Sequence, residues 1–168
     1  DEECDYLRQT NLFSDEFIGF LSLLRFRGNV MAMPEGTVFF ANEPMMEVTA
    51  PIIEAQLVET LLLNILGSNS LFTTKGARCA HVAQGRPLID FSLRRTQGQD
   101  AGLRVARSTF ISGFAGTSNV QAGSLYNIPV SGTMAHSYVT TFENEIDAFR
   151  AYAKVFPDNS VFLIDTYD

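Results

Sequence analysis

Three apolar segments that each end in charged or hydroxylic side chains constrain the fold of this chain most strongly. They cover residues 88–95, 128–137 and 161–168. Helix-like stretches near residues 98–113 and 144–156 lie between them. Such alternation is typical of parallel βα units, and in a parallel α/β barrel the catalytic groups lie at the carboxyl ends of the strands. The pattern predicts strands at 88–93, 129–134 and 161–165, with functional side chains at their ends.

A closed barrel of this kind needs about eight strands, so three strands predict only its first part. We therefore expect an α/β fold in which residues 87–168 form a partial α/β barrel. Residues 1–86 should form an α+β, sandwich-like N-terminal domain. Its expected elements are helices within 2–27, an antiparallel meander with strands at 30–33, 37–41 and 45–49, and helices from 51 to about 66 and from 72 to 83. The wide apolar arc after Pro51 predicts a helix buried between two layers.

Composition excludes several classes of protein. A chain with 46% hydrophobic and 18% charged residues is typical of a globular domain. The net charge of −7 argues against a nucleic-acid-binding surface, and the apolar run 61–66 is far shorter than the roughly 20 residues of a membrane span. Cys4 and Cys79 lack metal-ligand spacing, and no signal peptide is visible. We expect a cytoplasmic protein without nucleic-acid or membrane partners, and predict no metal-ligating residues.

His136 lies among small and hydroxylic residues, with Thr133 and Ser137 beside it. An imidazole at a strand end can act as an acid, a base or a phosphate acceptor, and neighbouring hydroxyls can bind a carboxylate or a phosphate. The alternative is a histidine that is only hydrogen-bonded within the structure, which is common.

Arg94 and Arg95 end the first predicted strand. A guanidinium group can bind a carboxylate or phosphate through two hydrogen bonds, and Phe91 could stack against a planar ring. The alternatives are a solvated arginine pair in a surface salt bridge and an aromatic residue of the core.

Two further segments suggest binding sites. Residues 116–119, with Ser118 among them, are either an anion cradle at a helix start or an ordinary turn with an N-cap. Asp165 and Asp168 end the third predicted strand, and such carboxylates suit ribose hydroxyls or a Mg²⁺-bound polyphosphate. Asp168 could instead cap a following helix.

In order and spacing, residues 90–98, 116–119, 132–137 and 165–168 resemble the nicotinate phosphoribosyltransferase family. Residues 25–28 and 34–44 are similar too, so the resemblance covers essentially the whole chain. It implies a type II phosphoribosyltransferase fold. The implied reaction joins nicotinate to phosphoribosyl pyrophosphate, giving nicotinate mononucleotide and pyrophosphate in NAD salvage synthesis, with coupled ATP hydrolysis. Mg²⁺ is expected with the phosphorylated substrates.

The resemblance also implies roles for single residues. His136 would be phosphorylated by ATP, and Thr133 would contact the pyridine, with Ser137 beside it. Asp165 and Asp168 would lie at the ribose and pyrophosphate. Phe91 and Arg94 would belong to the region of ring stacking and phosphate binding.

Ser118 predicts the choice of pyridine substrate. A similar nicotinamide-using enzyme has an Asp at the matching position, and its carboxylate accepts a hydrogen bond from an amide but repels a carboxylate. A neutral Ser118 favours nicotinate over nicotinamide.

The family's later barrel strands, a further arginine, a Gly-rich phosphate loop and an N-terminal tyrosine segment that reaches across a dimer are not among these 168 residues. We therefore expect an incomplete piece of a homodimeric enzyme. The alternatives are a nicotinamide-specific relative and a truncated binding or assembly module without turnover.

Overall fold

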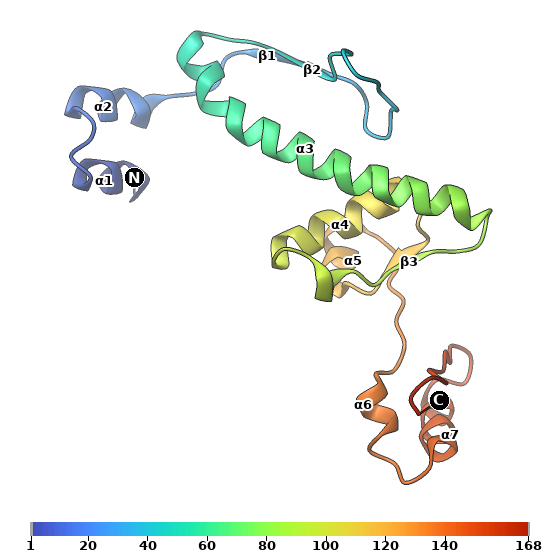
Figure 1. Ribbon diagram of the computed structural model, residues 1–168. Coiled ribbons are helices and arrows are strands. Elements are labelled where there is room, and N and C mark those ends of the chain that lie inside the picture. Colours follow the sequence, from blue (N-terminus) through green and yellow to red (C-terminus); the bar gives the residue numbers. More distant parts are fainter. Residues whose placement is uncertain (1, 168) are drawn as a thin grey trace. The chain divides into compact units, whose positions relative to one another are not determined.

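The computed structural model describes residues 2–167 (Figure 1). Its contacts divide the chain into two compact units, Asp1–Gly67 and Ser68–Asp168, which we describe separately. The division falls inside helix α3 (Ile52–Ala83). The domain boundary expected at residues 86/87 follows the end of that helix and stays a prediction.

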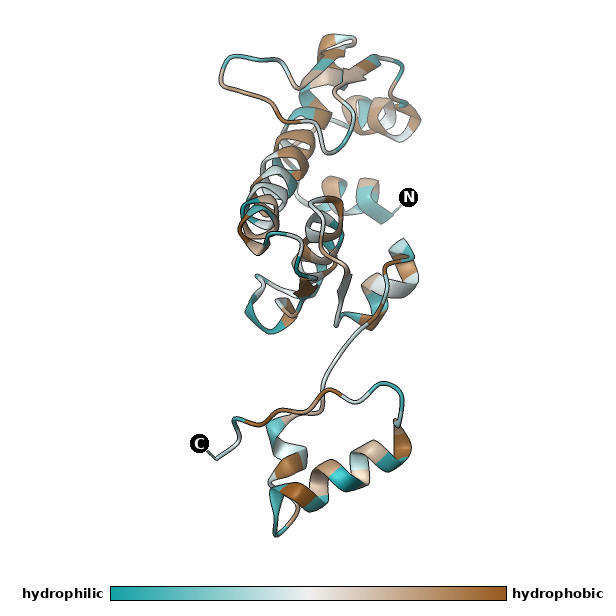
Figure 2. Cartoon of the chain, turned by 90° about the vertical axis from the view of Figure 1, so that its right-hand side faces the viewer, coloured by the Kyte–Doolittle hydropathy of each residue, from teal (hydrophilic) through white to brown (hydrophobic). Residues whose placement is uncertain are grey.

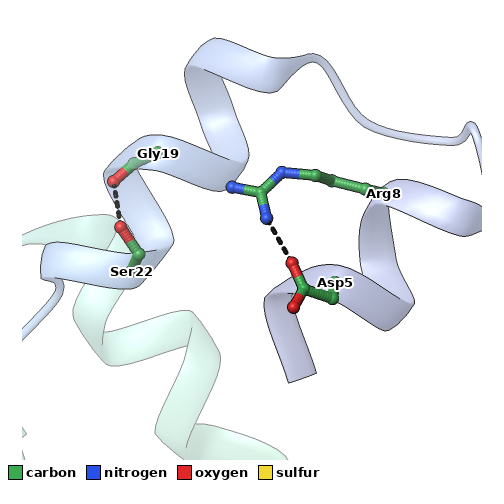
Figure 3. Close-up of polar contacts among 4 residues, drawn as sticks. All are labelled: Asp5, Arg8, Gly19 and Ser22. Atoms are coloured by element: carbon green, nitrogen blue, oxygen red, sulfur yellow. Dashed lines mark hydrogen bonds and ion pairs between the residues drawn. The ribbon is translucent and has the colours of Figure 1, made fainter. Parts of the chain in front are cut away.

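The first unit begins with two short helices, α1 (Glu2–Gln9) and α2 (Asp15–Leu23), which pack against each other. Ser14 caps α2 by accepting a hydrogen bond from the Phe17 amide at 3.2 Å, as its sequence predicts. Arg8 pairs with Asp5 at 2.6 Å in α1, and the Ser22 hydroxyl donates to the Gly19 carbonyl at 2.8 Å in α2 (Figure 3). These polar contacts are local and each stays within its own helix.

Two strands follow, β1 (Asn29–Ala32) and β2 (Met46–Thr49), paired antiparallel with Val30 opposite Val48. The third strand predicted at 37–41 is wrong. Because β1 and β2 pair directly with each other, the segment between them forms turns instead. In one of these turns the Phe40 amide donates to the Glu43 carboxylate at 2.7 Å.

Helix α3 is a single helix of 32 residues where two were predicted. The expectation that its apolar arc is buried is also wrong, since most of the large side chains of that arc are exposed: Ile52, Ile53, Leu57, Leu61 and Ile65. Leu63, Leu71 and Val82, elsewhere on the same helix, are exposed too. The spacing of apolar residues predicts a helix, but it does not show which other part of the protein covers the apolar face of that helix. Glu54, in contrast to those apolar side chains, is buried on this helix. Its carboxylate accepts a hydrogen bond from the Arg27 amide at 2.6 Å. No helix among residues 2–167 is long and apolar enough to span a membrane.

In the second unit, three parallel segments lie side by side. β3 (Ile89–Asp90) pairs with β4 (Gly116–Thr117), and Thr117 forms a parallel bridge with Val130. The predicted parallel direction is confirmed, but the strands are shorter than expected. The 3₁₀ turn η1 (Leu93–Arg95) replaces the end of strand 88–93, strand 129–134 is reduced to one bridge, and β4 lies where a loop was predicted.

Helices α4 (Gln99–Ile111) and α5 (Val120–Tyr126) pack against each other and against β4. The helix predicted at 98–113 is thus confirmed. Close backbone approach requires glycine at Gly116, because a Cβ there would lie 2.5 Å from the carbonyl oxygen of Pro129. Glycine at this position therefore lets β4 approach the segment of Pro129 and Val130 closely.

The last part of this unit contains α6 (His136–Val139) and α7 (Glu145–Val155), which confirms the helix predicted at 144–156. Both polar and apolar residues lie along α7 (Figure 2). Met134, Val139 and Ala148 form a small core to which Leu163 adds its side chain. No strand forms at 161–165 within the described residues, so that prediction is wrong; Leu163 packs against this helical core instead.

Candidate functional site

The chain segments that follow β3 and β4 are joined around Asp90, a carboxylate that is only 4% exposed. Its Oδ1 accepts a hydrogen bond from the Ser92 amide at 3.0 Å. Its Oδ2 accepts one from the Thr117 hydroxyl at 2.8 Å. The Ser118 amide donates to the Asp90 carbonyl at 2.8 Å. Two loops distant in the sequence are therefore held by one residue.

Ser118 lies half-buried between β4 and α5. The next residue, Asn119, caps α5 by accepting the Ala122 amide at 3.1 Å, and its own amide donates to the Thr117 hydroxyl at 3.1 Å. The Thr117 amide donates to the Pro129 carbonyl at 3.0 Å. The amides of residues 117–119 thus all have partners, which confirms the N-cap interpretation for Asn119 and leaves these three amides unable to form an anion cradle. For Ser118, the side-chain hydroxyl is therefore the hydrogen-bond donor that remains available to a ligand.

Phe91, Arg94 and Arg95 follow β3 and are exposed, and Phe91 as a whole residue is 49% exposed. Among residues 2–167, neither arginine forms an ion pair. Among the described residues, Phe91 is therefore not a core residue, and the two arginines are solvated, as one alternative proposed, but without its salt bridge. An exposed aromatic ring can stack on a planar ligand, and unpaired guanidinium groups can bind its anionic groups.

His136 is the first residue of α6 rather than the last of a strand, and two side chains from the end of the chain lie beside it. Its Nδ1 is 3.3 Å from the Thr166 hydroxyl oxygen, and its Nε2 is 3.8 Å from Oδ1 of Asp165. The imidazole is 52% exposed and the carboxylate 71%. An ion pair this exposed adds little stability, but a carboxylate and a hydroxyl beside an imidazole can orient the ring.

Thr133 and Ser137 are exposed on either side of Met134, whose burial anchors the segment in the α6–α7 core. Asp168 lies outside the described residues. The predicted residues thus fall into two groups. The first lies on the two loops that Asp90 joins and includes Phe91, Arg94, Arg95 and Ser118. The second lies on the segment of His136 and on the chain end that meets it, and includes Thr133, Ser137 and Asp165.

Three polar residues of these groups were not predicted from the sequence. Asp90 and Thr117 interact 27 positions apart, and Thr166 meets His136 across 30 positions. A carboxylate inside the apolar run of residues 88–91 is the one signal that could have marked Asp90.

The model for the nicotinate phosphoribosyltransferase N-terminal domain matches residues 1–67, and the model for the nicotinate phosphoribosyltransferase family matches residues 87–167. A nicotinate phosphoribosyltransferase of Mycobacterium tuberculosis is 49% identical over 100% of this chain and 36% of its own length. One of Bacillus subtilis is 45% identical over 100% of this chain and 34% of its own length. This chain therefore spans about a third of the length of these relatives.

Two solved structures are similar to the chain. Human nicotinic acid phosphoribosyltransferase superposes with a TM-score of 0.88 at 29% identity, over 98% of this chain and 43% of that one. Nicotinate-nucleotide pyrophosphorylase from Pyrococcus furiosus superposes with a TM-score of 0.80 at 28% identity, over 92% of this chain and 40% of that one. Since the family models match most of the sequence and relatives match all of it, this chain belongs to the nicotinate phosphoribosyltransferase family.

Proposed function

We propose that the protein carrying this chain forms nicotinate mononucleotide and pyrophosphate from nicotinate and phosphoribosyl pyrophosphate, in cytoplasmic NAD salvage synthesis. The observation that carries this proposal is the pair of parallel strand ends, where exposed Phe91 and unpaired Arg94 follow β3 and neutral Ser118 follows β4. In this proposal β3, β4 and the segment at Val130 are the first strands of an α/β barrel of the type II phosphoribosyltransferase kind, within a homodimer.

The substrate-binding roles follow from the chemistry of these side chains. Phe91 stacks on the pyridine ring, and Arg94 and Arg95 bind phosphate oxygens. The Ser118 hydroxyl donates to the carboxylate of nicotinate, and Thr133 contacts the same ring. A carboxylate at position 118 would repel nicotinate, so a neutral side chain there favours the acid over the amide.

In the reaction, the pyridine nitrogen attacks C1 of the ribose while the bond from C1 to the pyrophosphate oxygen breaks. Positive charge develops on the sugar, and carboxylates placed near it stabilise this charge. Asp165, 71% exposed, can supply one such carboxylate, and we assign Asp168 to the same side. The protein also holds the ring nitrogen in line with C1, which lowers the entropic cost of the attack.

His136 links the reaction to ATP in this proposal. An imidazole nitrogen attacks the γ-phosphorus of ATP; the N–P bond forms, the P–O bond to ADP breaks, and water later cleaves the phosphohistidine. The phosphoryl group brings nearly two negative charges. It therefore changes the affinities for pyrophosphate and for substrate by different amounts, which couples ATP hydrolysis to the equilibrium of the reaction.

Mg²⁺ fits this site as a partner of the phosphorylated substrates. It is commonly held by one or two carboxylates together with substrate phosphates, and Asp165 exposes oxygens of that kind. Among residues 2–167, no group of three or more His, Cys, Asp or Glu residues is placed to hold an ion alone. When bound, the ion would neutralise pyrophosphate charge as that group leaves.

The test is a turnover assay on the intact protein with phosphoribosyl pyrophosphate, Mg²⁺ and ATP, given nicotinate or nicotinamide, with nucleotide products separated by chromatography. We expect nicotinate mononucleotide, and more of it with ATP than without. Product from nicotinamide alone would favour the nicotinamide-specific relative. A folded protein with no product from either would favour a binding or assembly module.

A further inference from the structure

Asp90 joins the two loops that carry the proposed pyridine-binding residues. It ends β3 and is nearly inaccessible to solvent, at 4% exposure. One carboxylate oxygen accepts the amide of Ser92 on its own loop, and the other accepts the hydroxyl of Thr117 on the neighbouring strand. A single side chain therefore sets the position of one loop against the other.

On the first loop, this contact fixes the backbone on both sides of Phe91, which lies between Asp90 and Ser92. The Ser92 carbonyl in turn accepts the Arg95 amide at 2.7 Å, which closes the turn that carries Arg94. Moving Ser92 would therefore move both the aromatic ring and the guanidinium group.

On the second loop, the Thr117 hydroxyl donates to Asp90 and accepts the amide of Asn119. Ser118 lies between these two residues, and its own amide donates to the Asp90 carbonyl. The backbone of Ser118 is thus tied to Asp90 directly and through both neighbours.

The acceptor chemistry explains why a carboxylate occupies this position. Burying a charge costs free energy unless hydrogen bonds compensate it, and among residues 2–167 Asp90 has no cationic partner. Both of its oxygens accept, whereas an amide of the same shape offers one acceptor and one donor group. The amide could not accept hydrogen bonds from the Ser92 amide and the Thr117 hydroxyl at the same time.

We infer that Asp90 is a positioning residue that determines the preference for an acidic over an amide pyridine, by holding Ser118 against the loop of Phe91 and Arg94. The inference rests on the proposed function. It assigns to Asp90 no contact with substrate, and it predicts that discrimination between the two pyridines depends on the bond between Asp90 and Thr117.

The test compares Asp90→Asn and Thr117→Val in the intact protein. The readout is the ratio of kcat/KM for nicotinate to kcat/KM for nicotinamide. Because both values come from the same preparation, a loss of folded protein alone leaves this ratio unchanged. We expect each substitution to lower it by about tenfold or more, since displacement of positioning groups by about 1 Å can cost a hundredfold in rate.

Two variants serve as controls. Thr109 is also buried, and its hydroxyl donates to the Val105 carbonyl at 2.9 Å within α4. Thr109→Val removes an equivalent buried hydroxyl away from the two loops and should keep the wild-type ratio. Thr117→Ser retains the hydroxyl and should keep it as well. Unchanged ratios in both Asp90→Asn and Thr117→Val would overturn the inference.

Failure of the proposed function is distinguished by a second readout. If the wild-type protein turns over neither pyridine, the function is wrong, and amide hydrogen exchange then decides whether Asp90 positions the loops. The amides of Ser92, Ser118 and Asn119 should exchange faster in both variants, while those of α7 stay unchanged. Unaltered exchange at these three amides would contradict a positioning role.

Discussion

The two histidines of this chain have different surroundings. His136 has a hydroxyl at one ring nitrogen and a carboxylate near the other, whereas His81 lies exposed near the end of α3. A ring nitrogen held by a neighbouring group is easier to orient for nucleophilic attack than one that rotates freely in solvent. In the proposed function, the setting of His136, and not the imidazole alone, is what would suit it to accept a phosphoryl group.

We predict that the intact protein incorporates label from γ-³²P-ATP and that His136→Asn abolishes this incorporation. His81→Asn removes the other imidazole and should retain the label. The measurement is acid-labile radioactivity on the purified protein, quantified after rapid desalting. Equal labelling of the wild-type protein and His136→Asn would show that the phosphoryl group goes elsewhere.

The site residues that could be predicted from sequence are those whose chemistry shows locally. His136 lies among hydroxylic residues a few positions after the apolar run 128–130, so its chemistry is visible without any structure. Ser118 carries a hydroxyl in a glycine-containing turn, and its role comes from the family resemblance. Thr117 and Thr166 act through partners about thirty positions away, and nothing in the intervening sequence indicates those contacts. The contacts of Thr117 and Thr166 could be identified only from the three-dimensional structure.

Among the elements, α4, α7 and the antiparallel strands β1 and β2 lie close to where they were expected, whereas the short parallel strands were predicted poorly. α4 and α7 have enough residues to show a helical period, and they lie where expected. β3 and β4 have two residues each, which is too short for any alternation of apolar and polar side chains to appear. β4 was mistaken for a loop because Gly116 is typical of turns, although here glycine permits close approach of two backbones.

Gly116→Ala should therefore destabilise the protein by about 1–3 kcal/mol, because the new methyl group would overlap the Pro129 carbonyl. Gly132→Ala is the matched control. Nothing lies within 4 Å of a Cβ at Gly132, so its effect should stay within about 0.5 kcal/mol. Urea unfolding followed by circular dichroism measures both. Equal midpoints for the two variants would mean that the parallel segments do not approach as closely as described.

At the scale of the whole molecule, the sequence predicted an α/β fold with parallel strands, and the similarity to human nicotinic acid phosphoribosyltransferase agrees with mixed helix and strand content. The sequence did not predict that α3 is a single helix with exposed apolar side chains. A helical period gives the width of an apolar face, but the surface that covers this face belongs to tertiary structure. The chain spans 36% of the length of its Mycobacterium tuberculosis relative, so turnover must be measured on the intact protein.

The central claim is that the loops after β3 and β4 select nicotinate, and a competition assay tests it most directly. Equal concentrations of nicotinate and nicotinamide are offered together to the wild-type protein, Ser118→Asp and Ser124→Asp, with phosphoribosyl pyrophosphate, Mg²⁺ and ATP. Ser124 is exposed on α5, so this control adds the same charge away from the strand end.

The account predicts that the wild-type protein and Ser124→Asp form mainly nicotinate mononucleotide. Ser118→Asp should shift the product ratio toward nicotinamide mononucleotide by about tenfold or more, because like charges brought together cost several kcal/mol. An unchanged ratio in Ser118→Asp, or a wild-type preference for nicotinamide, would contradict it.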